Sequence, residues 1–134
     1  MRLKNTEILV LRTCKDDMSS HDGFRWPKKG NVEAPDWRNT DRCGNGLHGL
    51  PWGAGGDYLA KNAKNWLVVK VDVSKDYQHG TGDMSVKCKF KNGIVVYAGE
   101  KAGAIALIQT HMPINTACNF ALMQAGSAST QRAG

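Results

Sequence analysis

The stretch Trp66-Leu-Val-Val-Lys-Val-Asp-Val73 decides the fold class that this sequence predicts. It begins as a continuous apolar run and then alternates, with valine at positions 69, 71 and 73 and charged residues at positions 70 and 72. A period of two is typical of a β-strand that buries one face, and the preceding apolar run is typical of a strand covered on both faces. The segment therefore predicts a strand in the interior of a sheet.

Other strands are predicted on both sides of this segment. Glu7–Thr13 is a short apolar run with polar ends, which indicates a buried first strand. Met84–Phe90 alternates, with its apolar residues expected to face inward and Ser85, Lys87 and Lys89 to face outward. Lys91–Gly93 is typical of a hairpin turn, so Ile94–Tyr97 is expected to return as the partner of that strand.

The segments with helical spacing of apolar residues have a weaker pattern than the predicted strands. Asp57–Lys64 carries small and apolar residues at helix-compatible positions, and Asp57 is a suitable cap. Ala102–Gln109 fits either a helix or a strand, and its alanine content favours the helix. The sequence thus predicts an α+β domain over residues 1–125, with a small, mainly antiparallel sheet, one or two short helices and a long aromatic loop, followed by a flexible tail over residues 126–134.

The long loop is expected between Cys14 and Arg42, where glycine, proline and charged residues interrupt any sustained period. Loops of this length are uncommon in compact domains unless they have a function, and three large aromatic residues argue against disorder. We expect Phe24, Trp26 and Trp37 to pack onto the core while the basic residues face water. The same composition would also suit contacts to phosphates and bases of single-stranded nucleic acid. The candidate binding residues are Arg25, Trp26, Trp37, Arg38 and Arg42.

A glycine-rich segment follows, with six glycines in the fourteen residues Cys43–Gly56. Such density indicates tight turns or a close approach of the backbone to another group. Gly44 and Gly46 are candidate binding residues, because successive backbone N–H groups here would suit a phosphate. The alternative is that the glycines only turn the chain around Pro51 and Trp52, and the segment matches neither a P-loop nor a dinucleotide-binding motif.

Composition limits the class of protein. The chain has 134 residues, of which 41% are hydrophobic and 22% charged, and these values suit a single folded domain. No apolar run approaches the roughly 20 residues that a membrane-spanning helix needs, so no membrane contact is expected. Four widely spaced cysteines suit free thiols in a cytoplasm. A net charge of +6 favours an acidic partner, either a protein or a nucleic acid.

Cysteine and histidine residues in the first half of the chain raise two further possibilities. Cys14, His21, Cys43 and His48 are residue types that bind zinc, but their spacing matches no standard zinc motif. A thiolate pair of Cys14 with His21, or of Cys43 with His48, would suit nucleophilic catalysis if folding brought the two side chains together. The simpler interpretation is a buried cysteine and a hydrogen-bonded loop histidine, and no metal is expected.

Two resemblances add to this reading. Cys43–Gly49, followed by a short helix and the Trp66–Val73 strand, resembles a segment of ADP-ribosyltransferase-like folds. That resemblance implies NAD as cofactor, Arg12 and the Gly44–Gly49 backbone as its binding groups, and His48 and Glu100 as further catalytic residues. The acidic pair of that family is absent from this chain. His79-Gly-Thr81 is similar to an NAD-contacting tripeptide of related enzymes, and would replace Arg12 in that role.

The second resemblance is to small proteins of bacteriophages and bacteria, carried by Trp26-Pro27, Cys43–Gly53 and Val95–Gly99. It implies a phage-type accessory protein in the host cytoplasm. We therefore expect a binding protein without a cofactor, which uses the basic and aromatic surface around Arg25–Arg42 to engage an acidic host partner or nucleic acid. The alternative hypothesis is an NAD-dependent ADP-ribosyltransferase-like enzyme or an inactive descendant of one.

Overall fold

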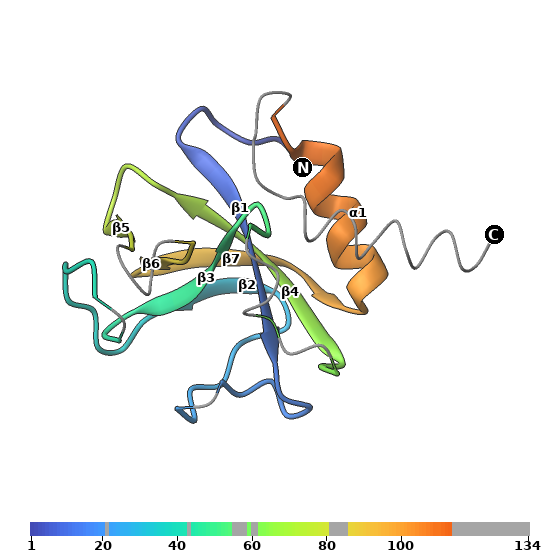
Figure 1. Cartoon of the computed structure of the whole chain (residues 1–134), viewed down its shortest axis with the longest axis horizontal. Helices are drawn as coiled ribbons and strands as arrows, with labels where there is room; N and C mark the ends of the chain where they lie inside the picture. Colours follow the sequence, from blue (N-terminus) through green and yellow to red (C-terminus); the bar gives the residue numbers. More distant parts are fainter. Residues whose placement is uncertain (21, 43, 55–58, 60–61, 81–85, 114–134) are drawn as a thin grey trace.

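The computed structural model describes residues 1–20, 22–42, 44–54, 59, 62–80 and 86–113, and these form one antiparallel sheet and one helix (Figure 1). The sheet order is β2-β7-β4-β1-β3-β6-β5. The elements are β1 (Glu7–Cys14), β2 (Gly30–Glu33), β3 (Leu47–Pro51), β4 (Asn65–Asp72), β5 (Tyr77–His79), β6 (Cys88–Phe90), β7 (Asn92–Gly99) and α1 (Lys101–His111). The predicted α+β class with a mainly antiparallel sheet is confirmed, and strands dominate it.

The centre of the sheet is the pairing of β1 with β4, which runs in register from Glu7 opposite Asp72 to Cys14 opposite Asn65. Both strands were predicted. Their continuous apolar runs follow from burial on both faces, since successive side chains of a strand point to opposite sides. Of the predicted alternating valines, Val69 and Val71 are buried, whereas Val73 lies just beyond β4 and is exposed.

Each face of the sheet has its own hydrophobic core. One, the loop-side core, lies under the segment between β1 and β3 and consists of Val10, Cys14, Met18, Trp26, Val32, Ala34, Leu47, Leu67, Val69, Val71, Cys88, Phe90 and Val95. The other, the helix-side core, consists of Leu9, Leu11, Leu50, Trp52, Leu59, Trp66, Val68, Ala104, Ile105 and Ile108. Helix α1 contributes the last three of these, and Figure 1 shows it along one side of the sheet.

The long segment after β1 packs as predicted. Trp26 is buried in the loop-side core, and Phe24 meets it edge-on with the ring centroids 5.7 Å apart. Trp37 is partly buried against the same core. The segment is more regular than expected, because Gly30–Glu33 forms edge strand β2 against β7. Four strand residues between turns are too few to produce a periodic pattern in the sequence.

The predicted hairpin at Lys91–Gly93 is wrong. Strand β6 pairs with β3 and β5, and β7 pairs with β2 and β4, so the two consecutive strands do not pair with each other. Gly93 is therefore not part of a hairpin turn. A Cβ atom there would lie 2.6 Å from Val69 Cγ1 and 3.2 Å from Phe90 Cε2, so glycine allows β7 to approach β4 closely.

The glycine-rich segment contains a strand that the sequence did not reveal. Leu47–Pro51 forms β3, which pairs with β1 and β6. Gly49 within it is required by close packing, since a Cβ atom there would overlap Val10 Cγ1. Strand β5, between β4 and β6 in the sequence, was not predicted either.

The helix preferred for Ala102–Gln109 is confirmed as α1. Half of the helix predicted at Asp57–Lys64 lies outside the described residues, and so does the whole tail over residues 126–134. Among the helical residues that the structure describes, none form a span long and apolar enough to cross a membrane.

Replacing Gly49 with alanine is expected to destabilise the protein by about 2 kcal/mol, because the added methyl overlaps the Val10 side chain in a packed interior. Urea unfolding of the single variants and of the Val10→Ala/Gly49→Ala double variant measures this overlap directly. The double variant should lose less stability than the sum of the two single changes. Additive losses would contradict the close approach of β3 to Val10.

Candidate functional site

Polar side chains meet inside the sheet around Arg12 of β1. Strand alternation places Arg12 on the same face as Val10 and Cys14, which is the face of the loop-side core. Its guanidinium carbon lies 4.3 Å from the centroid of the Trp26 ring, a cation–π distance. Nη1 donates to the backbone oxygen of His48 at 2.9 Å, and Nη2 donates weakly to the oxygen of Thr13 at 3.4 Å.

Burial is the main electrostatic influence on this group. It lowers the pKa of Arg12, although a guanidinium keeps its charge in proteins. Burial also raises the pKa of the neighbouring Cys14 thiol, and the nearby Arg12 charge opposes that effect only in part. A thiol whose pKa is raised is a weak nucleophile at neutral pH. His21, the partner expected for Cys14, lies outside the described residues.

His48, on β3, is held neutral. Its Nε2 atom accepts a hydrogen bond from the backbone N–H of Gly44 at 3.1 Å. Burial, and then the positive charges of Arg12, Lys89 and Lys87, lower its pKa to about 4. At neutral pH the ring is thus an acceptor within the protein, tied to the chain that precedes β3.

Lys89, on β6, lies directly opposite His48 and is fully buried. Its ammonium group donates to Thr40 Oγ1 at 2.9 Å and to the Gly44 oxygen at 3.1 Å, and lies 5.4 Å from the Trp37 ring centroid. The outward orientation predicted for Lys89 is therefore wrong. The segment that carries Thr40 and Gly44 covers the face of β6 on which the Lys89 side chain lies. The sequence did not predict this cover, because it did not predict strand β3.

The glycines predicted to cradle a phosphate are used inside the fold. Both backbone polar groups of Gly44 are bonded, the N–H to His48 and the oxygen to Lys89. A Cβ atom on Gly46 would lie 3.0 Å from Trp37 Cε3, so Gly46 provides room for that ring. The structure therefore favours the alternative in which the glycines serve packing and turning.

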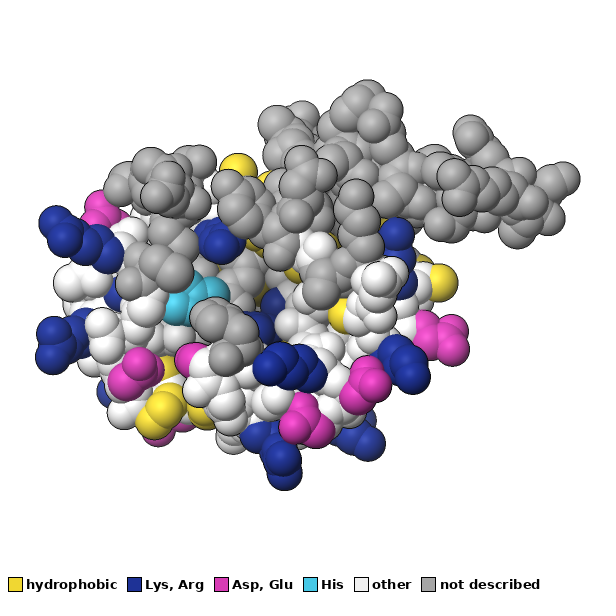
Figure 2. Space-filling view, turned by 60° about the horizontal axis from the view of Figure 1, so that its bottom comes forward, with side chains coloured by type: hydrophobic (Ala, Val, Ile, Leu, Met, Phe, Trp, Pro, Cys, Tyr) yellow, Lys and Arg dark blue, Asp and Glu magenta, His cyan; other side chains and the backbone are white. Residues whose placement is uncertain are grey.

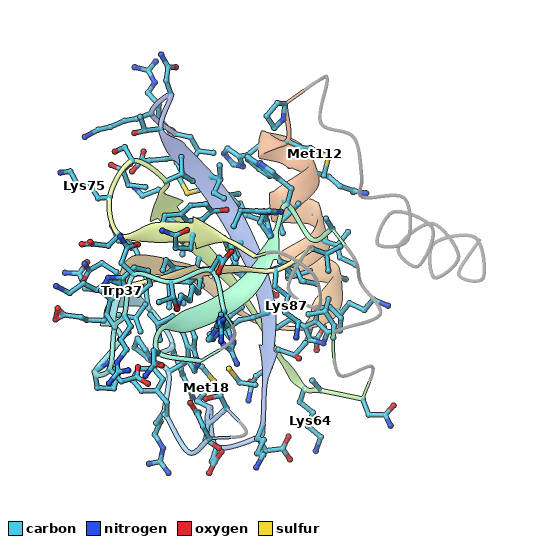
Figure 3. The ribbon with its side chains drawn as sticks, turned by 60° about the vertical axis from the view of Figure 1, so that its left-hand side comes forward. Met18, Trp37, Lys64, Lys75, Lys87 and Met112 are labelled. Carbon is cyan, nitrogen blue, oxygen red and sulfur yellow. The ribbon has the colours of Figure 1, made fainter. Side chains whose placement is uncertain are left out.

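The predicted aromatic and basic binding residues are separated by the fold. Trp26 is buried, whereas Arg25, Arg38 and Arg42 are exposed. Arg25 lies 3.7 Å from Asp17 in an ion pair at the surface. In Figure 3, Trp37 lies on the side of the molecule away from the end of α1. Figure 2 shows basic and acidic side chains interspersed over the face that it presents, so the expected basic patch is not assembled on that face.

The residues expected of a transferase do not come together either. Arg12 reaches His48 only through the backbone oxygen of that residue. Glu100 is the N-cap residue of α1, where its backbone oxygen accepts from the Tyr97 hydroxyl at 2.9 Å. Helix α1 packs on the helix-side core, on the opposite face of the sheet from the Arg12 side chain.

The remaining candidates concern metal binding. His21 and Cys43 lie outside the described residues, and so does Thr81 of the tripeptide that begins at His79. Within the described ranges, no group of three or more histidine, cysteine or acidic side chains is placed to hold a metal ion. The hydrogen bond from buried Lys89 to the exposed Thr40 is a contact that no sequence pattern indicated.

His48 makes stability depend on pH. Because its folded-state pKa of about 4 lies below the ordinary value of 6.5, the unfolded chain binds the proton more readily. Stability is therefore fully present above pH 6.5 and falls by up to about 3 kcal/mol as the pH drops towards 4. His48→Gln keeps an acceptor for Gly44 and removes this loss.

Chemical unfolding of the wild type and of His48→Gln at pH 7 and pH 4.5 measures the difference. His79→Gln, on the exposed β5, is the matched control and should keep the wild-type pH dependence. An equal loss of stability in wild type and His48→Gln would show that His48 does not resist protonation in the folded state.

Comparison with known proteins places the chain among bacterial sequences. It is 36% identical over 129 residues to an ice nucleation protein of Enterobacter agglomerans, covering 95% of this chain and 10% of that protein. It is 36% identical over 126 residues to one of Pantoea ananas, covering 92% of this chain and 12% of the relative. A Pseudomonas syringae ice nucleation protein is 40% identical over 100 residues, which cover 73% of this chain and 8% of the relative. No solved structure matches.

These relatives overturn the expectations of a phage accessory protein and of an ADP-ribosyltransferase-like enzyme. The compared proteins are named as bacterial ice nucleation proteins, and none of the findings links the chain to either of the expected classes. The expected cytoplasmic localisation, which followed from the cysteine spacing and from the phage resemblance, was wrong as well, because the relatives are ice nucleation proteins. In the glycine-rich motif behind both resemblances, residues 47–49 belong to strand β3 and the oxygen of Gly44 accepts a hydrogen bond from Lys89.

A family model also matches the chain. Residues 8–106 match the family described as a domain of unknown function, DUF7666. The match begins in β1 and ends within α1, so it includes the loop-side core, the Arg12 region and all of the helix-side core except Ile108. The chain spans about a tenth of the length of the ice nucleation proteins that it matches. The chain belongs to the DUF7666 family.

Proposed function

We propose that this chain acts in bacterial ice nucleation as a folded accessory module, and that it does not order water into ice on its own surface. The observation that carries the proposal is the 36% identity that extends over 95% of this chain but over only 10% of the relative from Enterobacter agglomerans. A similarity of this extent supports a shared folded module. Most of each relative lies outside that module, which leaves the templating surface to other parts of those proteins.

The side chains that line the surface of the sheet also support the proposal that this chain does not template ice. Both faces of the central strands are covered by the two cores. Beyond α1, an open recess of about 490 Å³ is lined by Glu7, Asn31, Val32, Glu33, Lys70, Asp72, Asn92, Gly93 and Ile94. An ice-ordering face needs the same side chain repeated at regular intervals, so that neighbouring water molecules are held in one lattice. This recess mixes both signs of charge with amides and an isoleucine.

The small size of the chain also supports the proposal that it does not order water into ice by itself. A chain of 134 residues has a radius of gyration of about 14 Å. An ice nucleus must exceed a critical size before it grows, and at mild supercooling that size is larger than such a domain. Extension through sheet edges is also disfavoured, because the edge strands β2 and β5 have only four and three residues. A single copy therefore offers too little surface to start freezing.

Droplet-freezing assays test the proposal in two steps. Droplets containing the purified chain should freeze at the same temperature as buffer droplets. An ice nucleation protein in which the matching segment is replaced by this chain should freeze droplets as its parent does. Replacement by an unrelated folded domain of similar size should reduce the number of active nuclei per cell at equal expression.

A chimaera carrying Leu67→Asp is the matched control. Leu67 is fully buried in the loop-side core, so a carboxylate there should unfold the module and reproduce the loss seen with the unrelated domain. Freezing at a raised temperature by the purified chain alone would show that it templates ice itself. Full activity with the unrelated domain would show that the module has no specific part in nucleation.

A further inference from the structure

Two hydrogen-bond donors lie buried without an acceptor in the Arg12 region. Among the described residues, Nε of Arg12 and Nε1 of Trp26 are the buried side-chain polar atoms that have no hydrogen-bond partner. Trp26 is only 2% exposed, so bulk water does not reach its ring. The two groups belong to one contact, since the Arg12 guanidinium lies over the Trp26 ring.

Each buried donor without an acceptor lowers the stability of the folded state by about 1–3 kcal/mol. Buried polar groups in native proteins nearly always have a hydrogen-bond partner. Two unpaired donors in the same contact thus indicate an acceptor that is not part of the protein chain. Both groups are N–H donors that cannot accept, so the missing species has to be an acceptor.

The surrounding charges favour a negative acceptor over water. Arg12, Lys87 and Lys89 all act on His48 with positive charge, and Asp22 is the acidic residue that acts on both Arg12 and His48. The ion pairs between described residues join Arg25 to Asp17, Lys64 to Asp16 and Lys70 to Glu7, and none of them includes Arg12. A cation in a poorly solvated setting gains most from an anion in direct contact.

We propose that a small inorganic anion binds in the loop-side core beside Arg12, with Arg12 Nε and Trp26 Nε1 as its donors. Because Trp26 is almost fully buried, the proposed anion is a small halide such as chloride rather than the larger phosphate or sulfate. The anion would hold the segment that carries Trp26 against β1, and so would fix the cover of the loop-side core. This site is independent of the role proposed in ice nucleation.

Thermal unfolding at constant ionic strength tests the site. Bromide or chloride should raise the melting temperature of the wild type with a saturable dependence on concentration, whereas phosphate and gluconate at the same ionic strength should not. Trp26→Phe keeps an aromatic ring under Arg12 and removes only the N–H. It should weaken the apparent affinity for bromide by about tenfold or more. Trp52→Phe, in the helix-side core, is the matched control and should bind bromide as the wild type does.

A crystal of the wild type grown in bromide provides a readout that does not depend on any variant. Anomalous scattering should place one bromide within hydrogen-bond distance of Arg12 Nε. A water molecule at that position, or equal stabilisation by bromide and gluconate, would overturn the proposal. So would an equal bromide affinity in Trp26→Phe and wild type.

Discussion

The pairing of β1 with β4 is the constraint on which the rest of the structure depends. These two strands share an eight-residue register at the centre of the sheet, and both of their faces are apolar. A sheet buried on both faces needs a cover on each side, and this chain supplies two different covers. Helix α1 shields Leu9 and Leu11, while the segment that carries Trp26 shields Val10 and Cys14.

Arg12 is the exception in β1, because it places a charge on a face that is otherwise apolar. The surroundings of Arg12 follow from the need to solvate that charge. The Trp26 ring, the backbone oxygens of His48 and Thr13, and the proposed anion each supply part of what water would provide. Beside it, Lys89 fastens the segment around Gly44 to the sheet, and His48 completes that attachment. These polar contacts place the irregular part of the chain against the sheet.

The parts of the fold that could be predicted are those with a strong local pattern. β1 and β4 carry apolar runs, which continue as alternation in β4, and the alanine content of Ala102–Gln109 favoured the helix that α1 forms. The burial of Trp26 follows from its large apolar ring. β3 could not be predicted, because Gly49 and the neighbouring glycines are typical of a loop. In the structure, glycine at position 49 leaves room for the Val10 side chain. The false hairpin at Lys91–Gly93 arose because a turn-like sequence was used for close strand packing. The buried position of Lys89 depends on contacts with Thr40 and Gly44, distant in sequence, and alternation alone gave the opposite orientation.

The chain is similar to a segment that makes up about a tenth of an ice nucleation protein. The role proposed for it as an accessory module depends on a stable fold built around the central strand pair. Hydrogen exchange followed residue by residue tests that claim most directly. Amides in the middle of β1 and β4 should exchange only through global unfolding, while those of β5 should exchange through local opening. Exchange of the central β1 amides as fast as those of β5 would contradict the account, because the fold would then not depend on the β1–β4 pair.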